Sequence, residues 1–495
     1  MHRTRRLLQL LGLLALPLTA VSPIGAADYY WDANGKTTGT GGTGTWDTSN
    51  NNRWHRDTAN GTLTRWRNGG SNRAIFGGTS GSVNVSTGIS ANGLLFSTSG
   101  YTLTGNSITL TGVSPTITVA GTSTSVATIS AVLAGTNINV LKAGDGVLTL
   151  TAENTFTGSL SVNAGTVRLG GTTDLDFINR DCALTLNGGT FDLGNFIEDT
   201  DVFTLNGGTI TGGASAALGV LTSSATSANA FDVRSGTADV ILSNPFSPNW
   251  WLGDATSVGL TKTTNGIVTL TRANTYTGAT RILAGTLVLN GSVSRESTIT
   301  VAHGAVFAGT GTTNDASVIL DGTVSPGAMS ASGVSTIGTL TTGAQTWNGG
   351  GSYEWQIANA GGAAGTGWDF LRLGGALSIG ATDTNPFTLE LIGLGTDGTS
   401  GAVAGFDNSQ SYVWTLLTSA TISGLSPRNV TIDSTLFEAG NALGGGQFSL
   451  VQSGSSLNLV FTPVPEPAVY ALALGVGTLG VAAVRQWRRK RGLIA

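Results

Sequence analysis

The chain has only one cysteine, Cys182, and few charged side chains, which make up 11% of its 495 residues. A single cysteine excludes an intramolecular disulfide, so we expect Cys182 to be a small buried residue, with intermolecular pairing as the alternative. Before the C-terminal basic cluster the sequence contains only three lysines, and the formal net charge is −4. Nucleic-acid binding needs clustered Lys and Arg, so nucleic acid is not an expected partner.

Helical periodicity is also absent outside the two termini. Instead, β-branched and aliphatic residues alternate with polar ones over most of the chain, which is typical of strands. The 74 glycines supply frequent turn signals such as Asn-Gly, Asp-Gly and Gly-Gly. The sequence therefore predicts an almost wholly β protein between its ends.

An internal repeat indicates which kind of β protein this is. Residues 142–171 align without a gap on residues 262–291, with 14 of 30 positions identical. Three short strands with one apolar face each are expected in the first copy. Their apolar residues are Leu148 and Leu150, Leu160 and Val162, and Val167 and Leu169. Three strands cannot bury these faces alone, whereas stacked turns bury a continuous core, so we predict a parallel β-solenoid.

Asparagines recur at the spacing of one turn. The segment Thr-Leu-Asn-Gly-Gly-Thr occurs twice, 19 residues apart, which places Asn187 over Asn206. Stacked side-chain amides can form a hydrogen-bonded ladder. We expect the same structural role for Asn154 and Asn274, with ligand binding as the alternative for all four.

Each repeat copy contains the pattern Leu-Thr-Leu-x(3)-Asn-Thr-[Phe/Tyr]-Thr-Gly-x(5)-Ala-Gly-Thr. It runs from Leu148 to Thr166 and from Val268 to Thr286, where Val268 replaces the first leucine. The pattern is similar to the autotransporter-associated β-strand repeat of exported surface proteins, here assigned to residues 141–171 and 261–291. The resemblance implies a right-handed parallel β-helix that is displayed outside the cell.

Three parts are expected between the ends of the chain. Residues 28–84 contain four tryptophans and are predicted to form an N-terminal cap over the exposed strand edges of a solenoid, although these side chains could instead stack on sugar rings. Residues 85–344 are assigned to the solenoid. Residues 345–463 show longer alternating runs, which we interpret as an antiparallel β domain.

The N-terminus has the features of a secretory signal peptide over residues 1–27. Three arginines precede the apolar stretch from Leu7 to Ala20, and small residues lead to Ala27 and Asp28. We expect cleavage before Asp28 or within a residue or two of it. A first transmembrane helix is the alternative, but Pro17 and Pro23 interrupt an already short run.

Residues 464–495 combine a Pro-Glu-Pro motif, an uncharged run from Ala468 to Val484 and a basic tail. The motif is Pro465, Glu466 and Pro467, and the tail residues are Arg485, Arg488, Arg489, Lys490 and Arg491. The run would be about 26 Å long as a helix and only just spans a bilayer core, so we predict one short C-terminal transmembrane helix with its basic end in the cytoplasm. A permanent tail anchor is the alternative to a temporary one.

This tripartite ending resembles the PEP-CTERM sorting signal of Gram-negative bacteria. The resemblance implies recognition by an exosortase, a membrane-embedded processing enzyme, which removes the tail. The inner membrane would then hold the chain only transiently, and the destination would be the outer surface or the extracellular matrix.

One acidic segment is a candidate for chemistry. Asp181 and Asp201 are 20 residues apart, near the length of one turn, and Asp174 and Asp176 lie close by in sequence. Stacked carboxylates can bind Ca²⁺ or flank a glycosidic bond. Catalysis would also need a general base or an opposing acid, and the nearest basic residue, Arg180, is a poor proton acceptor. A solvated loop is therefore the expected interpretation. No cofactor and no firm metal site are predicted, and His55 and His303 are expected to be ordinary surface or core residues.

Two function classes follow. We expect a non-enzymatic surface or matrix protein that adheres to extracellular polysaccharide through a long Thr, Ser and Asn surface, with avidity supplying the affinity. The alternative is a polysaccharide lyase or hydrolase that uses the acidic segment. The two resemblances concern export and architecture, and a fold alone does not establish a function.

Overall fold

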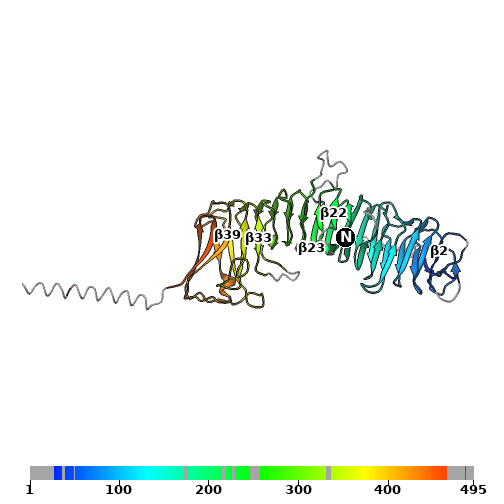
Figure 1. Cartoon of the computed structure of the whole chain (residues 1–495), viewed down its shortest axis with the longest axis horizontal. Coiled ribbons are helices and arrows are strands. Elements are labelled where there is room, and N and C mark those ends of the chain that lie inside the picture. Colours follow the sequence, from blue (N-terminus) through cyan, green and yellow to red (C-terminus); the bar gives the residue numbers. More distant parts are fainter. Residues whose placement is uncertain are drawn as a thin grey trace, which may run out of the picture.

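The described residues form an elongated stack of short strands that begins at the N-terminal cap and reaches the last described strands before residue 464 (Figure 1). The computed structural model describes residues 27–35, 40–49, 51–171, 177–213, 219–225, 229–245, 257–329, 336–464 and 485. Within these residues the chain winds in successive turns, and each strand pairs mainly with the equivalent strands of the turns before and after it. This is the architecture of a parallel β-solenoid.

Two long faces make up the main sheet, and their strands pair in parallel from turn to turn. The strands of the first face are β5 (Arg73–Phe76), β8 (Gly93–Phe96), β11 (Thr116–Val119), β14 (Ile138–Ala143), β16 (Gly158–Val162), β18 (Cys182–Leu186), β21 (Phe203–Gly212), β23 (Phe231–Asp239), β25 (Leu260–Lys262), β27 (Thr280–Ile282), β29 (Ile299–Val301), β31 (Val318–Leu320), β34 (Gln345–Trp347), β37 (Leu377–Ile379) and β40 (Ile422–Ser423). The strands of the second face are β2 (Gly44–Trp46), β6 (Ser82–Val85), β9 (Tyr101–Gly105), β12 (Val126–Ile129), β15 (Val147–Leu150), β17 (Thr166–Leu169), β19 (Thr190–Gly194), the later halves of β21 and β23, β26 (Ile267–Leu270), β28 (Thr286–Leu289), β30 (Val306–Gly309), β32 (Thr323–Pro326), β35 (Ser352–Ile357), β38 (Phe387–Gly393) and β41 (Val430–Asp433).

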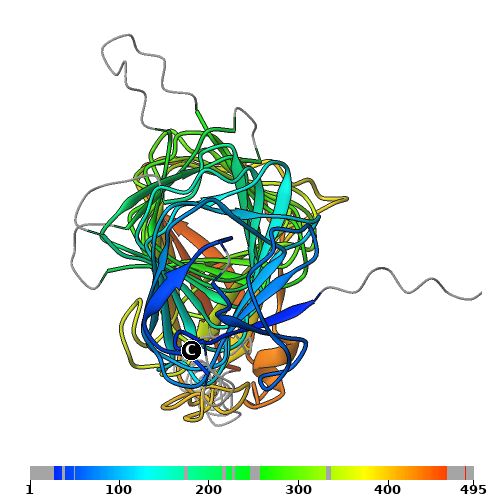
Figure 2. The ribbon, with the colours of Figure 1, turned by 90° about the vertical axis from the view of Figure 1, so that its right-hand side faces the viewer.

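A third side is formed in some turns by shorter sheets, whose strands lie in the chain between the second face and the next strand of the first face. These strands are β7 (Ile89–Ala91), β10 (Ile108–Leu110) and β13 (Leu133–Ala134), then β20 (Ile197–Thr200), β22 (Val220–Ser223) and β24 (Ile241–Ser243), and finally β33 (Thr339–Thr342), β36 (Phe370–Leu373) and β39 (Tyr412–Thr418). A view along the long axis shows the turns enclosing one interior (Figure 2).

The apolar residues predicted inside the first repeat are all buried, with exposures of 3% or less. Their strands, however, do not form the three sides of a single turn. β15 and β17 are stacked partners on the second face, with Leu148 opposite Val167, whereas β16 lies on the first face between β14 and β18. The three predicted strands therefore belong to two successive turns.

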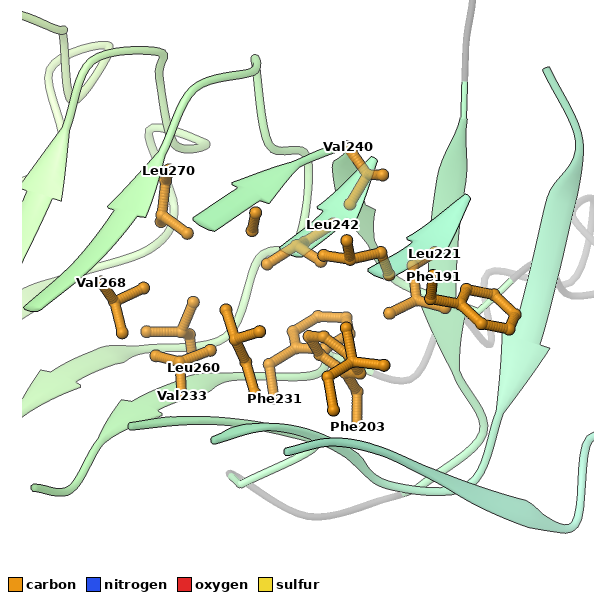
Figure 3. Close-up of a cluster of buried hydrophobic side chains, with 14 of the residues drawn as sticks. Phe191, Phe203, Leu221, Phe231, Val233, Val240, Leu242, Leu260, Val268 and Leu270 are labelled. Carbon is orange, nitrogen blue, oxygen red and sulfur yellow. The ribbon is translucent and has the colours of Figure 1, made fainter. Parts of the chain in front are cut away.

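The interior is filled by stacked aliphatic and aromatic side chains. Figure 3 shows Phe203 and Phe231 close together near the centre of the stack, and the register pairs these two residues directly. Leu260 follows on the next turn opposite Phe231. All three are fully buried. Because burial of apolar surface contributes about 25 cal/mol per Å², such columns are the main favourable term of the fold.

The N-terminal end is closed by an antiparallel hairpin with a tryptophan cluster. β1 (Asp28–Trp31) pairs antiparallel with β3 (Trp54–Arg56), which in turn pairs with β4 (Leu63–Thr64). Trp54 lies with its ring 5.1 Å from the rings of Trp31, Trp46 and Trp66, and the four are at most 1% exposed. These rings are inaccessible to sugars, so they pack the end of the stack. The stack itself begins earlier than residue 85, since β1 pairs in parallel with β5 and β2 with β6.

The C-terminal part differs from the antiparallel domain expected for residues 345–463. Parallel pairing continues from β32 through β35 and β38 to β41, which ends at Asp433. Antiparallel pairing within these described residues joins β39 to β43 (Ser456–Thr462) and β43 to β42 (Gln447–Ser453). Alternation with period two marks a strand with one buried face but does not distinguish parallel from antiparallel neighbours.

A short helix, α1 (Thr435–Glu438), follows β41, and its Phe437 is fully buried. Within the described part of the chain no helix has the length and apolar character required to cross a bilayer. The predicted span from Ala468 to Val484 lies outside the described residues.

Replacing Trp54 with alanine should destabilise the N-terminal cap, because the change leaves a cavity among three other tryptophans. Core Trp→Ala substitutions cost about 3–5 kcal/mol, and we expect a loss of this size in the free energy of unfolding measured by urea titration. Val113→Ala is the matched control, since Val113 is 78% exposed. Equal stability of the two variants would contradict the buried cluster.

Candidate functional site

The residues shared by the two repeats form a corner in place of a third-side strand. Asn154 is 2% exposed, and its Oδ1 accepts the backbone N–H of Leu133 on the preceding turn at 2.8 Å. Its Nδ2 donates to the carbonyl of Phe177 on the following turn at 2.7 Å. Asn274 makes the equivalent bonds to Leu242 and Ser292, at 3.0 Å each. These asparagines therefore have a structural role, because they link neighbouring turns. They do so through hydrogen bonds to backbone groups and not through the expected ladder of side-chain amides.

Two of the three lysines before the basic tail are buried at equivalent positions of the repeats. Lys142 Nζ donates to the carbonyls of Ala143, Gly144 and Ala164, at 3.0, 2.7 and 3.1 Å. Lys262 Nζ donates to the carbonyls of Thr264 and Ala284. Burial lowers the pKa of each ammonium to about 8, against an ordinary value of 10.5. We did not predict from the sequence that these lysines bind buried carbonyls. The alignment of Lys142 with Lys262 at the start of the two repeats was the signal that could have indicated it.

The predicted asparagine ladder is present and is one residue longer than expected. Asn206 Nδ2 donates to Asn187 Oδ1 at 3.1 Å, and Asn187 Nδ2 donates to Asn163 Oδ1 at 3.0 Å. Other polar side chains are also linked between turns, such as Ser159 to Asn139 at 2.9 Å. Parallel turns lie about 4.8 Å apart, so these groups repeat at that interval along the outside of the solenoid.

Several carboxylates of the acidic segment are occupied by internal contacts. Asp192 pairs with Arg168 at 2.9 Å, and Asp199 with Arg180 at 3.3 Å. Glu198 is fully buried, and its carboxylate accepts the backbone N–H groups of residues 177 and 178 at 3.2 and 2.7 Å. These contacts account for the three carboxylates as parts of the fold.

The predicted Ca²⁺ residues are only partly described. Asp181 and Asp201 are exposed and lie on successive turns, since the N–H of Asp201 donates to the carbonyl of Cys182 at 3.1 Å. Asp174 and Asp176 lie outside the described residues. Among the residues that can be placed, no cluster of three or more His, Cys, Asp or Glu side chains could hold a metal. Cys182 is buried as expected, and burial raises the pKa of its thiol to about 12.

His55 is a buried polar residue whose partners the sequence did not reveal. Its Nε2 lies 3.0 Å from Asp32 Oδ2, and its Nδ1 lies 2.9 Å from the carbonyl of Gly61. A carbonyl only accepts, so Nδ1 carries a proton. Both His55 and Asp32 are at most 1% exposed within the N-terminal cap, where no substrate can reach them.

The predicted targeting residues lie at the limits of the described chain. Asp28 begins β1 and forms a bidentate ion pair with Arg73, at 2.9 and 2.7 Å, which raises the pKa of the guanidinium. Ala27 is 5% exposed, and its carbonyl accepts the N–H of Arg73 at 3.1 Å. Arg485 is exposed. The motif of Pro465, Glu466 and Pro467 and the tail residues Arg488, Arg489, Lys490 and Arg491 lie outside the described residues.

The buried lysines predict an unusual pH dependence of stability. Between about pH 8 and pH 9 the unfolded chain holds more protons on Lys142 and Lys262 than the folded chain does, so the free energy of unfolding should rise with pH. Above about pH 9 the thiol of Cys182 opposes this trend, because it ionises only when the chain unfolds.

Urea midpoints measured at intervals from pH 7.5 to pH 9 test this expectation. In the Lys142→Met/Lys262→Met variant the rise should disappear, while stability falls by about 1–3 kcal/mol per site because buried carbonyls lose their donor. A rise that persists unchanged in the variant would assign the effect to other groups.

Comparison with known families supports the repeats. The passenger-associated-transport-repeat family matches residues 140–169 and residues 260–289. These two matches coincide with the two corners built around Asn154 and Asn274. The chain thus carries two autotransporter-associated repeats within a parallel β-solenoid.

A curated protein resembles a larger part of the chain. Over 159 residues the chain is 39% identical to the "Adhesin BmaC autotransporter" of Brucella suis biovar 1 (strain 1330). The aligned part covers 32% of this chain but only 4% of that protein. This chain is therefore similar to one short portion of a very long adhesin.

Proposed function

We propose that this protein is an exported, non-enzymatic surface or matrix protein whose solenoid adheres to extracellular polysaccharide. The observation that carries the proposal is the similarity of about a third of the chain to an autotransporter adhesin, together with two passenger-type repeats inside the solenoid. The relative's name describes adhesion, and we extend that role to this chain.

The outer surface suits many weak polar contacts. The ladder of Asn163, Asn187 and Asn206 presents amides in line across three turns, and hydroxyls such as Thr151 and Ser130 are linked in the same way, at 2.7 Å. A sugar chain laid along such a surface would meet the same kind of group at each turn. Each contact contributes little, so many must act together to give useful affinity.

An enzymatic role is the alternative, and the described contacts favour the adhesive one. In the acidic segment Asp192 and Asp199 are paired with arginines, and Glu198 is buried on backbone N–H groups. Only Asp181 and Asp201 are left exposed among the described carboxylates of this segment. A glycosidase needs one carboxyl as acid and a second as base or nucleophile, so this exposed pair is the one to test.

A binding and turnover assay separates the two classes. We expect the full chain to co-sediment with exopolysaccharide from its host without releasing reducing ends, and we expect the Asp181→Ala/Asp201→Ala variant to behave in the same way. Asp321→Ala, which removes another carboxylate elsewhere on the solenoid, is the control for a general charge effect. Depolymerisation by the parent chain that disappears in the double variant would establish the enzyme instead.

We also propose that the chain reaches its destination through PEP-CTERM processing. In this proposal the span from Ala468 to Val484 holds the chain transiently in the inner membrane, and an exosortase acts near Pro465, Glu466 and Pro467. The described fold supports a cut there, because β43, the last strand among the described residues, ends at Thr462, so removal of the tail leaves its pairing with β39 and β42 intact.

Intact mass of the protein from envelope and matrix fractions tests the processing. We expect a C-terminus near Glu466, with or without an added lipid or glycan, and an N-terminus at Ala27 or Asp28. An N-terminus at Ala27 would keep the bond from Arg73 to its carbonyl. A mass that retains Ala495 would instead indicate a tail-anchored protein and refute exosortase processing.

A further inference from the structure

The C-terminal end of the stack leaves one long strand edge without a partner. β42 pairs with β43, and no other strand among the described residues pairs with its second edge. The remaining described strands that have a single partner are two to four residues long, whereas β42 has seven residues. Short edge strands resist pairing with another chain, but a long one offers a row of free N–H and C=O groups.

This edge also lacks the charged residues that usually protect an edge strand. Residues 439–465, which include β42, β43 and the turn between them, contain no Asp, Glu, Lys, Arg or His. β42 itself contains no proline. By contrast, the short edge strand β41 ends in Asp433, and β4 is followed directly by Arg65. Charges and prolines oppose the addition of a further strand, so β42 is the least protected edge of the described fold.

The pairing order shows where this free edge points. On the third side β36, β39, β43 and β42 follow one another, and on the second face β35, β38 and β41 do so. β39 follows β38 in the chain, so β43 lies level with β41, and β42 lies one strand further along the axis. The strands around β39 form the C-terminal end of the stack (Figure 1). The unpaired edge of β42 therefore points out of that end.

A groove of about 720 Å³ opens beside β42 at this end. It is lined by residues 448–450 of β42, residues 430–432 of β41 and the loop at residues 425–427. Phe448 and Leu450 pack against the core but are only partly buried, because the second face ends at β41, one strand short of them. Leu425 and Ile432, on the other wall, are partly buried as well. A strand added beyond β42 would cover these apolar side chains.

The chain's own tail is poorly placed to supply that strand. Val464, the last described residue before the tail, lies beside Gly445 at the start of β42. Pro465 and Pro467 follow, and neither has an N–H to donate to a strand ladder. In the processing proposed above, on which this step rests, the chain ends near Glu466. Two residues span about 7 Å, less than the two strand spacings of about 9.6 Å from β43 to the far side of β42.

We propose that β42 pairs antiparallel with β42 of a second copy, in a two-fold symmetric dimer whose C-terminal ends meet. A two-fold axis through Leu450 sets all seven residues of each strand opposite those of the other, with Ser449 facing Val451 of the partner subunit. An interface of this symmetry is self-complementary, and here no like charges meet across it. The inner faces of the two sheets stay on the same side, so the two grooves join and cover Phe448.

The dimer is a property beyond the adhesive function proposed above. It would double the length of the rod and place one tryptophan cap at each end. Two copies of the polar outer surface would then belong to one particle, which increases avidity without any new contact to a glycan.

Light scattering coupled to size-exclusion chromatography tests the dimer. We expect the protein recovered from its host to have twice the mass of one chain. Val451→Lys should raise the dissociation constant of the dimer about tenfold or more, because a lysine on an edge strand opposes strand addition. Val413→Lys is the matched control and should leave the dimer intact. Val413 is 64% exposed on the same side of the same sheet, since it is in register with Val460 and Val460 with Ser449, but it lies two strands from the edge.

Cysteine pairing tests the register of the two strands. A mixture of the Ser449→Cys and Val451→Cys variants should form a disulfide-linked dimer under oxidising conditions, and neither variant should form one alone. Residues directly opposite each other have Cβ atoms about 4.5–5.5 Å apart, whereas identical residues would lie on the longer diagonal. Cys182 is buried and does not compete.

The intact mass of the same sample records separately whether the tail has been removed. A dimer in a sample that retains Ala495 would refute the processing alone. A monomer in either form would overturn the dimer proposal. So would a dimer that Val451→Lys leaves intact, or a mixture of the cysteine variants without a disulfide.

Discussion

Parallel, in-register pairing between successive turns is the constraint on which the rest of this structure depends. Most strands find their hydrogen-bond partners in the turns before and after them, so most side chains of the two faces stack on an equivalent one. Apolar residues such as Phe203, Phe231 and Leu260 therefore form continuous columns inside. The same rule places polar residues in columns outside, where Asn206 donates to Asn187 and Glu354 is in register with Glu390. The two ends of the stack are its open edges, and the tryptophan hairpin and the β39, β43 and β42 sheet lie there.

The residues shared by the two repeats satisfy backbone hydrogen-bonding groups in turns that lack a third-side strand. Between β15 and β16 the chain turns without a β-ladder, and Asn154 supplies the bonds to the neighbouring turns. Lys142 satisfies three carbonyls at the next corner. Both residues are polar and nearly inaccessible. Their side chains are required because the backbone groups that they contact would otherwise be buried without hydrogen-bond partners. This accounts for their presence in both copies of the repeat.

Much of this architecture could be predicted from the sequence, because a 19-residue spacing and an alternating pattern report the turn length and the buried side of each strand. The ladder of Asn187 and Asn206 is confirmed on that basis. The pairing direction beyond residue 345 was not predictable, since alternation is the same for parallel and antiparallel strands. Nor was the stack of Glu354 on Glu390, because these residues belong to turns of unequal length. The burial of Lys142 and His55 depends on three-dimensional neighbours that composition does not report.

The described chain is a long solenoid that is stabilised inside by apolar columns and carries polar ladders outside. Where the ladder of Asn163, Asn187 and Asn206 runs, the surface displays the same group on three successive turns, which suits the many weak contacts of the proposed adhesion. Solution X-ray scattering of the full chain tests the continuous stack most directly. A single elongated particle with a constant, compact cross-section is the predicted result. A globular profile, or the profile of separate lobes joined by a flexible chain, would contradict a continuous stack from the tryptophan cap to Asp433.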